Sequence, residues 1–184
     1  MPLRNTTEAY GSLAKFLHWS IVLLIIAQYF LAEWADELPD GIEKLQLISR
    51  HKSVGMLVLL LVLARIGWKV MNRGTPRPIG DPWQRKAAAA GHGLLYLLIL
   101  AQPISGWLMS SAANYPVTLF GWFQFPALVA PDHDLHEGLE ELHEALFTIL
   151  AIVALVHAAA AIYHHFWMKD GVLRRMLPFS KPST

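Results

Sequence analysis

The chain has 184 residues, of which 54% are hydrophobic and only 16% are charged, and its mean hydropathy is +0.37. The length indicates one domain, residues 1–184, and the composition is too apolar for an ordinary soluble domain, so we expect a membrane protein. The absence of cysteine excludes disulfides, iron–sulfur clusters, thiolate ligands and a covalently attached c-type haem. The net charge is +1, and we expect the lipid bilayer and no nucleic acid among the partners.

Four apolar stretches are each about 20 residues long, which is the length that crosses a bilayer as an α-helix. They cover residues 15–35, 52–71, 91–111 and 143–166. The first is too long and bulky for a signal peptide and has no small-residue cleavage site after it, so we expect it to remain as a helix. Short connections between the stretches predict an all-α, four-helix up-and-down bundle.

Proline and aromatic residues mark the connections. The Pro-rich segment 74–82 is expected to be a loop, because proline blocks continuation of a helix. Residues 112–132 form the longest connection, and its FGWFQFP segment is expected at the membrane interface. Pro103 is expected to kink the third helix, which a buried bundle tolerates.

Charge is distributed unevenly among the connections. Twelve of the fifteen Lys and Arg residues lie in the N-terminal end, residues 65–86 or the C-terminal tail, whereas eleven of the fourteen Asp and Glu residues lie in 33–44 and 132–144. By the positive-inside rule, both termini and the second connection are expected to face the cytoplasm. All seven tryptophans lie near the ends of predicted spans, as an aromatic belt requires.

Histidines occur at two depths of the predicted bundle. His51 and His143 begin the second and fourth spans at the outer face, and His18 and His92 begin the first and third at the inner face. His157 follows His143 by fourteen positions, which is about 21 Å along a helix and a return to within about 40° of the same face. The fourth helix therefore presents one imidazole at each depth.

The same offset selects informative residues on the other three helices. Fourteen positions after the first histidine of each span come, in chain order, Ala32, Arg65 and Gly106. Small residues leave room for a bulky planar group, and a buried arginine could pair with a carboxylate that is otherwise costly to bury. The alternatives are that Gly106 is a close helix-packing residue and that Arg65 extends its charge to the inner interface.

Imidazoles at two depths favour haem iron as the ligand. Zinc usually gathers three or four ligands at one point, whereas two imidazoles from different helices suit the two axial positions of a haem. Closed axial positions favour electron transfer over oxygen activation, and the spacing predicts two stacked haems with irons about 20 Å apart. The residues alone leave open whether His18 or His92 partners His157. They also leave open whether His164 and His165 have a function or only interfacial hydrogen bonds, and His133 and His136 are expected to be solvated.

Longer motifs around these histidines resemble a known family. LHW (17–19), HKSVG (51–55), AGHGLLYLL (90–98), LHEAL (142–146) and VHAAAAIYHHFWMKDGVLRRM (156–176) are similar to the bacterial cytochrome b561 family of four-helix, di-haem membrane cytochromes. The resemblance covers nearly the whole chain and is greatest to the superoxide:ubiquinone oxidoreductases of that family. It implies two haem b groups, with His18 and His157 on the inner iron and His51 and His143 on the outer one.

The resemblance also implies a function. His92 and His164 would lie at a cytoplasmic-side quinone site and pass protons, while electrons travel from a periplasmic donor, superoxide in the first instance, to ubiquinone. The acidic outer connections differ most from the family. One alternative is therefore a cytochrome subunit that relays electrons between the quinone pool and a periplasmic redox partner. A second alternative is a haem-free transporter that uses histidines for metal ions or protons.

Overall fold

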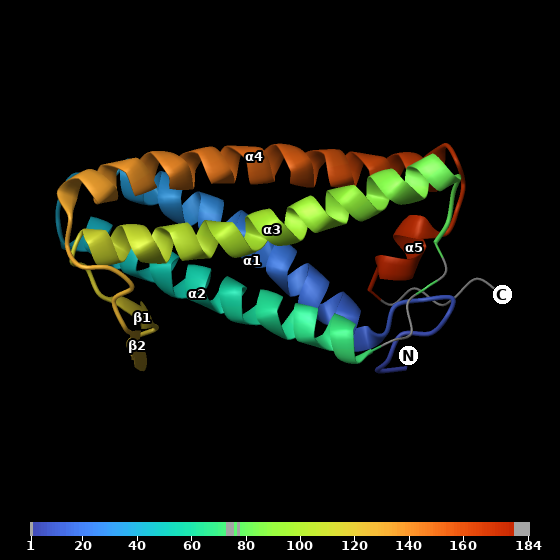
Figure 1. Ribbon diagram of the computed structural model, residues 1–184, viewed down its shortest axis with the longest axis horizontal. Helices are drawn as coiled ribbons and strands as arrows, with labels where there is room; N and C mark the ends of the chain where they lie inside the picture. The colour runs from blue at the N-terminus through green and yellow to red at the C-terminus, as the bar shows by residue number, and fades with distance from the viewer. Residues whose placement is uncertain (1, 73–75, 77, 179–184) are drawn as a thin grey trace.

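The computed structural model describes residues 2–72, 76 and 78–178, and long helices dominate it (Figure 1). The elements are α1 (Ser12–Asp36), α2 (Ile42–Met71), α3 (Pro82–Ala112), β1 (Val117–Leu119), β2 (Phe123–Phe125), α4 (His133–Phe166) and α5 (Val172–Met176). Helices α1 to α4 are each long and apolar enough to cross a membrane, which confirms the expected helical bundle. Part of the Pro-rich connection 74–82, residues 74, 75 and 77, lies outside the described residues.

Three of the four long helices begin well before the apolar stretches that predicted them. Helices α2, α3 and α4 start at residues 42, 82 and 133 rather than 52, 91 and 143. Capping explains two of these starts: Asp81 and Gln84 form a capping box, and the Asp132 carboxylate accepts a hydrogen bond from the Leu135 amide at 3.0 Å. Hydropathy marks where a helix enters lipid, whereas the cap marks where the helix begins.

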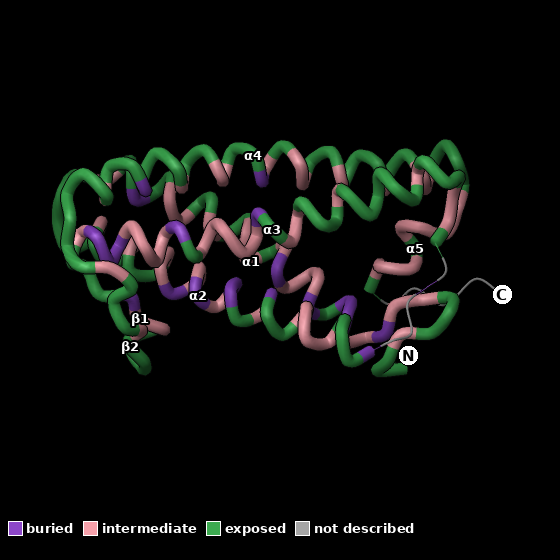
Figure 2. The backbone as a smooth tube through the Cα atoms, in the orientation of Figure 1, coloured by how far each residue is buried: buried purple, intermediate pink, exposed green. Residues whose placement is uncertain are grey.

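The bundle consists of two helix pairs. Helix α1 packs along α2 and α3 packs along α4, while the pairs meet mainly through α2 and α3. A core cluster of Ile21, Val58 and Val62 joins α1 and α2 and is covered by side chains of α3. On α4 only Leu139 and Leu150 are buried, and Figure 2 shows most of this helix exposed. The two pairs are therefore joined by a narrow central core and not by a filled interior.

The connection between α3 and α4 contains a β-hairpin that the sequence analysis did not anticipate. Strands β1 and β2 pair antiparallel, with Val117 opposite Phe125, and Val117 packs against Met56 and Leu59 of α2. The buried hydroxyl of Ser53 on α2 lies 2.8 Å from the Thr118 carbonyl and accepts a hydrogen bond from the Phe120 amide at 3.1 Å. The hydrogen bonds of Ser53 thus hold the hairpin against α2, two residues after His51.

The substitution Ser53→Ala tests whether the Ser53 hydroxyl holds the hairpin against α2. Removal of the hydroxyl leaves the Phe120 amide without its acceptor, at a cost of about 1–3 kcal/mol for a buried donor. We expect hydrogen exchange at the Phe120 amide to accelerate about tenfold or more in the variant. Thr148→Val is the matched control, because the Thr148 hydroxyl bonds only to the Glu144 carbonyl of its own helix. Equal exchange rates at Phe120 in the wild type and Ser53→Ala would contradict this role for Ser53.

Candidate functional site

The outer histidines face each other across the gap between the two helix pairs. His51 of α2 and His143 of α4 have ring centroids 6.3 Å apart, with their planes inclined at 74°. Two metal–nitrogen bonds of about 2.0–2.1 Å on opposite sides of one metal ion would put the centroids about 6 Å apart. The separation of these rings therefore fits one metal ion between them.

The protonation of His51 is fixed by α1. Its Nδ1 lies 3.3 Å from the Gln28 carbonyl oxygen, and the Gln28 side-chain amide donates to the His51 carbonyl at 3.0 Å. Because a carbonyl only accepts, Nδ1 carries the proton and Nε2 keeps its lone pair. This is the tautomer that a metal ion bound at Nε2 requires.

His143 is held in the same tautomer by α3. The Ser105 hydroxyl donates to the Gln102 carbonyl at 2.8 Å, so its oxygen accepts the Nδ1 proton of His143 at 2.9 Å. The Gln102 amide nitrogen lies 3.1 Å from both Nε2 and the carbonyl oxygen of His143, so it would have to rotate if a metal ion bound at Nε2. A Cβ atom at Gly106 would lie 3.0 Å from the His143 ring, which shows why this position is glycine.

Two buried side-chain oxygens without hydrogen-bond partners indicate that another group belongs at this level. The side-chain oxygens of Gln28 and Gln102 are buried and have no hydrogen-bond partner within the described chain. Native proteins rarely leave such acceptors unsatisfied. In the described residues no three His, Cys, Asp or Glu side chains gather to hold a metal ion, which argues against a zinc-type site. Two facing imidazoles from different helices fit haem, which His51 and His143 would hold and which would supply redox chemistry there.

A second pair of imidazoles, with His18 near it, lies at the level predicted to be the inner one. His92 of α3 and His157 of α4 have ring centroids 5.2 Å apart, which is shorter than a metal ion between them would require. His18 of α1 is close enough to both for electrostatic interaction, and its ring contacts that of Trp19. In the part of the chain that is described, the His18 ring makes no ring contact with His157. The structure thus brings His18, His92 and His157 together but places His92, rather than His18, against His157.

Arg65 lies beside this inner group. Its Nε donates to the Tyr96 hydroxyl at 3.2 Å and one terminal nitrogen donates to the Ala14 carbonyl at 3.0 Å, which uses two of the five N–H donors of a guanidinium. Burial raises the pKa of the nearby Tyr10 phenol, and the positive charge of Arg65 opposes this only in part. This level therefore combines the guanidinium of Arg65 and the ammonium group of Lys69, which lies 4.9 Å from the centroid of the Tyr96 ring, with phenols and imidazoles.

The C-terminal segment covers the inner end of the bundle. His164 pairs with Asp170 at 2.5 Å through Nδ1, and the other oxygen of Asp170 accepts the Val172 amide at the start of α5. Lys15 and Trp19 of α1 donate to the carbonyls of Leu177 and Met176 just beyond. These bonds hold His164 in a fixed orientation at the inner face.

The sequence analysis missed four residues that orient these imidazoles: Gln28, Gln102, Ser105 and Asp170. The two glutamines were detectable in principle, because an amide inside an apolar span is costly and usually faces a functional interior. Asp170 lies beyond the last span, and nothing in its sequence context indicates a contact with His164.

A membrane bundle that holds two facing imidazoles in the tautomer protonated at Nδ1, which leaves Nε2 as the metal ligand, has the arrangement of a membrane cytochrome b. The sequence matches the family described as prokaryotic cytochrome b561 over residues 9–179. It is 35% identical to "Cytochrome b561 homolog 2" of Escherichia coli K12, over 96% of this chain and 95% of that protein. It is 30% identical to "Probable superoxide oxidase CybB" of Yersinia pestis, over 93% of this chain and 97% of that protein. The chain therefore belongs to the prokaryotic cytochrome b561 family, whose members are membrane electron-transfer proteins with b-type haem.

Ser105→Ala tests how α3 orients His143. Loss of the acceptor for the Nδ1 proton releases the ring and its tautomer, and loss of such a partner typically costs about 10–100-fold in metal affinity. We expect the purified variant to lose haem faster to apomyoglobin, an external haem acceptor, as followed by absorption. Ser110→Ala is the control, because Ser110 is equally buried on the same helix and its side chain does not contact His143. Equal haem loss from both variants would show that Ser105 does not position the ligand.

Proposed function

We propose that this protein is a di-haem membrane oxidoreductase that passes electrons from a periplasmic donor, superoxide in the first instance, to ubiquinone at the cytoplasmic side. The facing pair His51 and His143, 6.3 Å apart with both Nδ1 protons occupied by the protein, carries the proposal. When bound, the haems would supply reversible one-electron redox chemistry at two depths of the membrane. The bundle would lie in the bacterial inner membrane with both termini in the cytoplasm.

His51 and His143 would hold the outer iron through Nε2, and His18 and His157 the inner one. The electrostatic contact of His18 with His157 supports the second pair, although the ring of His92 lies closer. The remaining N–H donors of Arg65 would bind a haem propionate, because the positive charge of the guanidinium offsets the cost of burying a carboxylate at this depth.

His92 and His164 would serve the quinone. Quinone reduction needs two protons, so groups that bind or donate protons must lie near the inner haem. The His164–Asp170 pair joins an imidazole to a carboxylate beside water, and Tyr10 stays neutral at neutral pH because burial raises its pKa. These groups could deliver protons from the cytoplasm, so electrons from outside and protons from inside would make turnover electrogenic.

Ligand removal tests the number of haems and their assignment. His51→Ala and His18→Ala should each leave one haem of two, while His92→Ala should keep both haems and lose quinone reduction. The measurement is the ratio of haem to protein by pyridine haemochrome. His133→Ala, an exposed position, is the control. Loss of all haem from either ligand variant would refute the two-site proposal, and loss of one haem from His92→Ala would reverse the inner assignment.

A substitution at the outer face tests whether superoxide is the electron donor. Arg50 is exposed beside His51, whereas Lys52 donates to the Pro116 carbonyl at 3.2 Å and so helps to hold the hairpin. Arg50 is therefore the cleaner position at which to change electrostatic attraction of superoxide. We expect Arg50→Glu to slow superoxide-driven quinone reduction by up to about tenfold and to weaken its salt dependence. Arg85→Glu on the opposite end of the bundle is the control, and an unchanged rate would remove this steering role.

One observation favours the alternative of a relay to a periplasmic redox protein. Helix α4 extends ten residues before His143, and the exposed carboxylates on and beside this extension are Asp132, Asp134, Glu137, Glu140, Glu141 and Glu144. Such a surface repels an anion and fits a basic protein partner. If the purified protein reduced no quinone with superoxide but accepted electrons from a basic redox protein, the relay function would replace the superoxide function.

A further inference from the structure

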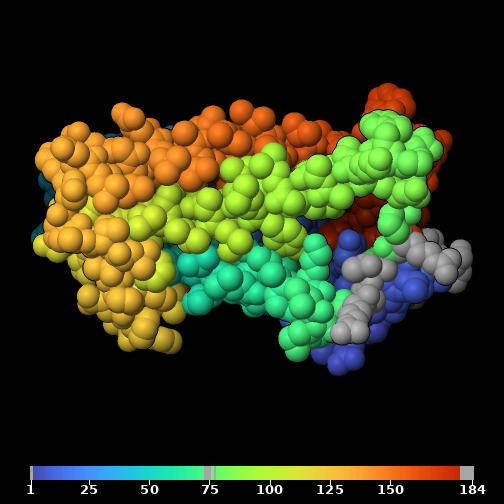
Figure 3. Space-filling view, viewed as in Figure 1, coloured from blue at the N-terminus to red at the C-terminus, as the bar shows by residue number. Residues whose placement is uncertain are grey.

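The turn of the β-hairpin exposes a cluster of aromatic side chains. Phe120, Trp122 and Phe123 are 52%, 93% and 56% exposed, and we call residues 120–123 the aromatic turn. Phe120 and Gly121 have φ angles of 52° and 77°, so a tight reversal presents these side chains at the tip. Figure 3 shows the hairpin as a protrusion from one end of the bundle. A large exposed aromatic patch of this kind marks a contact surface.

Hydrogen bonds fix the level of the aromatic turn along the bundle. Ser53 binds the Thr118 carbonyl and the Phe120 amide, and Ser53 lies where the apolar part of α2 begins. The preceding turns of α2 carry Glu43, Lys44 and Arg50, which belong in water. The hairpin lies beside α2 and points away from the bundle axis (Figure 1). The turn is therefore held beside the helix at the depth where α2 passes from water into lipid.

The absence of charged residues around the aromatic turn favours lipid as its binding partner. No Asp, Glu, Lys or Arg occurs between Lys86 and Asp132, although residues 33–44 and 132–144 are strongly acidic. A docking surface for a charged soluble protein would carry complementary charge. Tryptophan and phenylalanine at this level have the character of membrane-interface residues. Beneath the turn, the base of the hairpin is apolar too, because Val117 is buried against Met56 and Leu59 of α2, and Trp107 of α3 packs on the same cluster.

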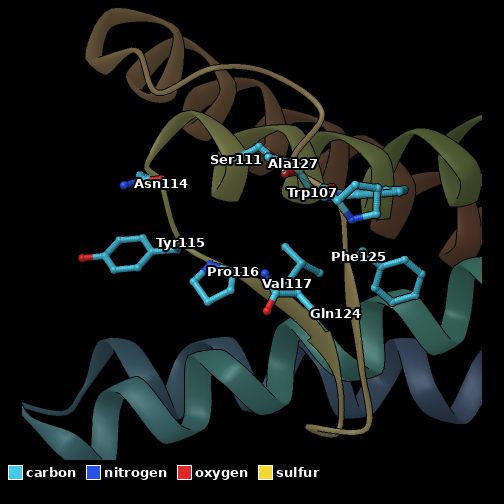
Figure 4. A pocket seen from close by; sticks show the side chains of 10 residues that line it. Trp107, Ser111, Asn114, Tyr115, Pro116, Val117, Gln124, Phe125 and Ala127 are labelled. Atoms are coloured by element: carbon cyan, nitrogen blue, oxygen red, sulfur yellow. Dashed lines mark hydrogen bonds between the residues drawn. The ribbon is translucent and has the colours of Figure 1, made fainter.

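The base of the hairpin contacts α2 on one side and borders a cavity on the other. A cavity of about 330 Å³ lies between the hairpin and the end of α3, lined by Trp107, Ser111, Val117 and Phe125 among others (Figure 4). On its other side the hairpin is held by α2 through Ser53 and Lys52. The tip therefore extends beyond the protein that supports its base.

We propose that the aromatic turn inserts into the interfacial layer of the outer leaflet and anchors the bundle beside its outer histidine pair. The partner is the boundary between lipid headgroups and acyl chains, about 5–10 Å below the membrane surface. Through Ser53, a fixed depth of the turn would also fix the depth of the first turns of α2, which carry His51.

Spin labelling tests the insertion directly. The chain contains no cysteine, so Trp122→Cys offers a unique site for a nitroxide label, and Phe123→Cys gives a second site if the first variant folds poorly. The proteins are reconstituted in nanodiscs of phosphatidylcholine and phosphatidylglycerol. Power saturation then compares collisions with oxygen, which concentrates in lipid, and with a water-soluble nickel complex. Glu141→Cys on the exposed acidic part of α4 is the aqueous reference, and Leu63→Cys, 51% exposed within α2, is the lipid reference.

We expect the label at position 122 to be several-fold less accessible to nickel than the label at 141 and clearly accessible to oxygen. Its depth should fall between the two references. Nickel accessibility equal to that at position 141 would place the turn in water and overturn the proposal. A label shielded from both reagents would also overturn it, because a second copy of the chain or another protein would then cover the turn.

Discussion

A neutral imidazole inside an apolar bundle must satisfy its N–H group, and this requirement organises the helix pairing. Gln28 of α1 satisfies His51 of α2, and Ser105 of α3 satisfies His143 of α4. These are the same two helix pairs that pack most extensively. Each pair therefore presents one oriented imidazole to the space between the pairs. The packing within each pair thus sets the tautomer of its imidazole, and the two rings lie 6.3 Å apart between the pairs.

The central hydrophobic cluster lies between the two histidine levels along the helices. On α2, Val58 follows His51 by seven residues and precedes Arg65 by seven, and it belongs to the central cluster with Ile21 and Val62. On α4, buried Leu150 lies seven residues from each of the two histidines. A seven-residue step returns to nearly the same helix face, so one stripe alternates polar, apolar and polar positions. The arrangement of two polar compartments on either side of an apolar centre follows from this repeat.

The same repeat explains how much the sequence could predict. Apolar length and histidine spacing located the four helices and the two depths, because both depend on the regular geometry of a helix. The early starts of α2, α3 and α4 were missed since hydropathy does not register a helix that continues into water. The hairpin was missed because three-residue strands carry too little pattern. The contact of His92 with His157, and the bonds made by Gln28 and Gln102, depend on how each helix is rotated against its neighbour, which periodicity alone does not determine.

The two ends of the bundle differ in their capacity to move protons. At the outer level both Nδ1 protons are bound to protein acceptors, Lys52 is engaged by the hairpin and the nearest turn is uncharged. At the other level Arg65 binds the Tyr96 hydroxyl and lies near Tyr10, His92 contacts His157, and two turns further along α4 His164 pairs with Asp170. A donor that gives up a single electron needs no proton carrier, whereas a quinone that becomes a quinol needs two protons. The proposed quinone reduction at the end that α5 covers would therefore depend on these phenol, imidazole and carboxylate groups.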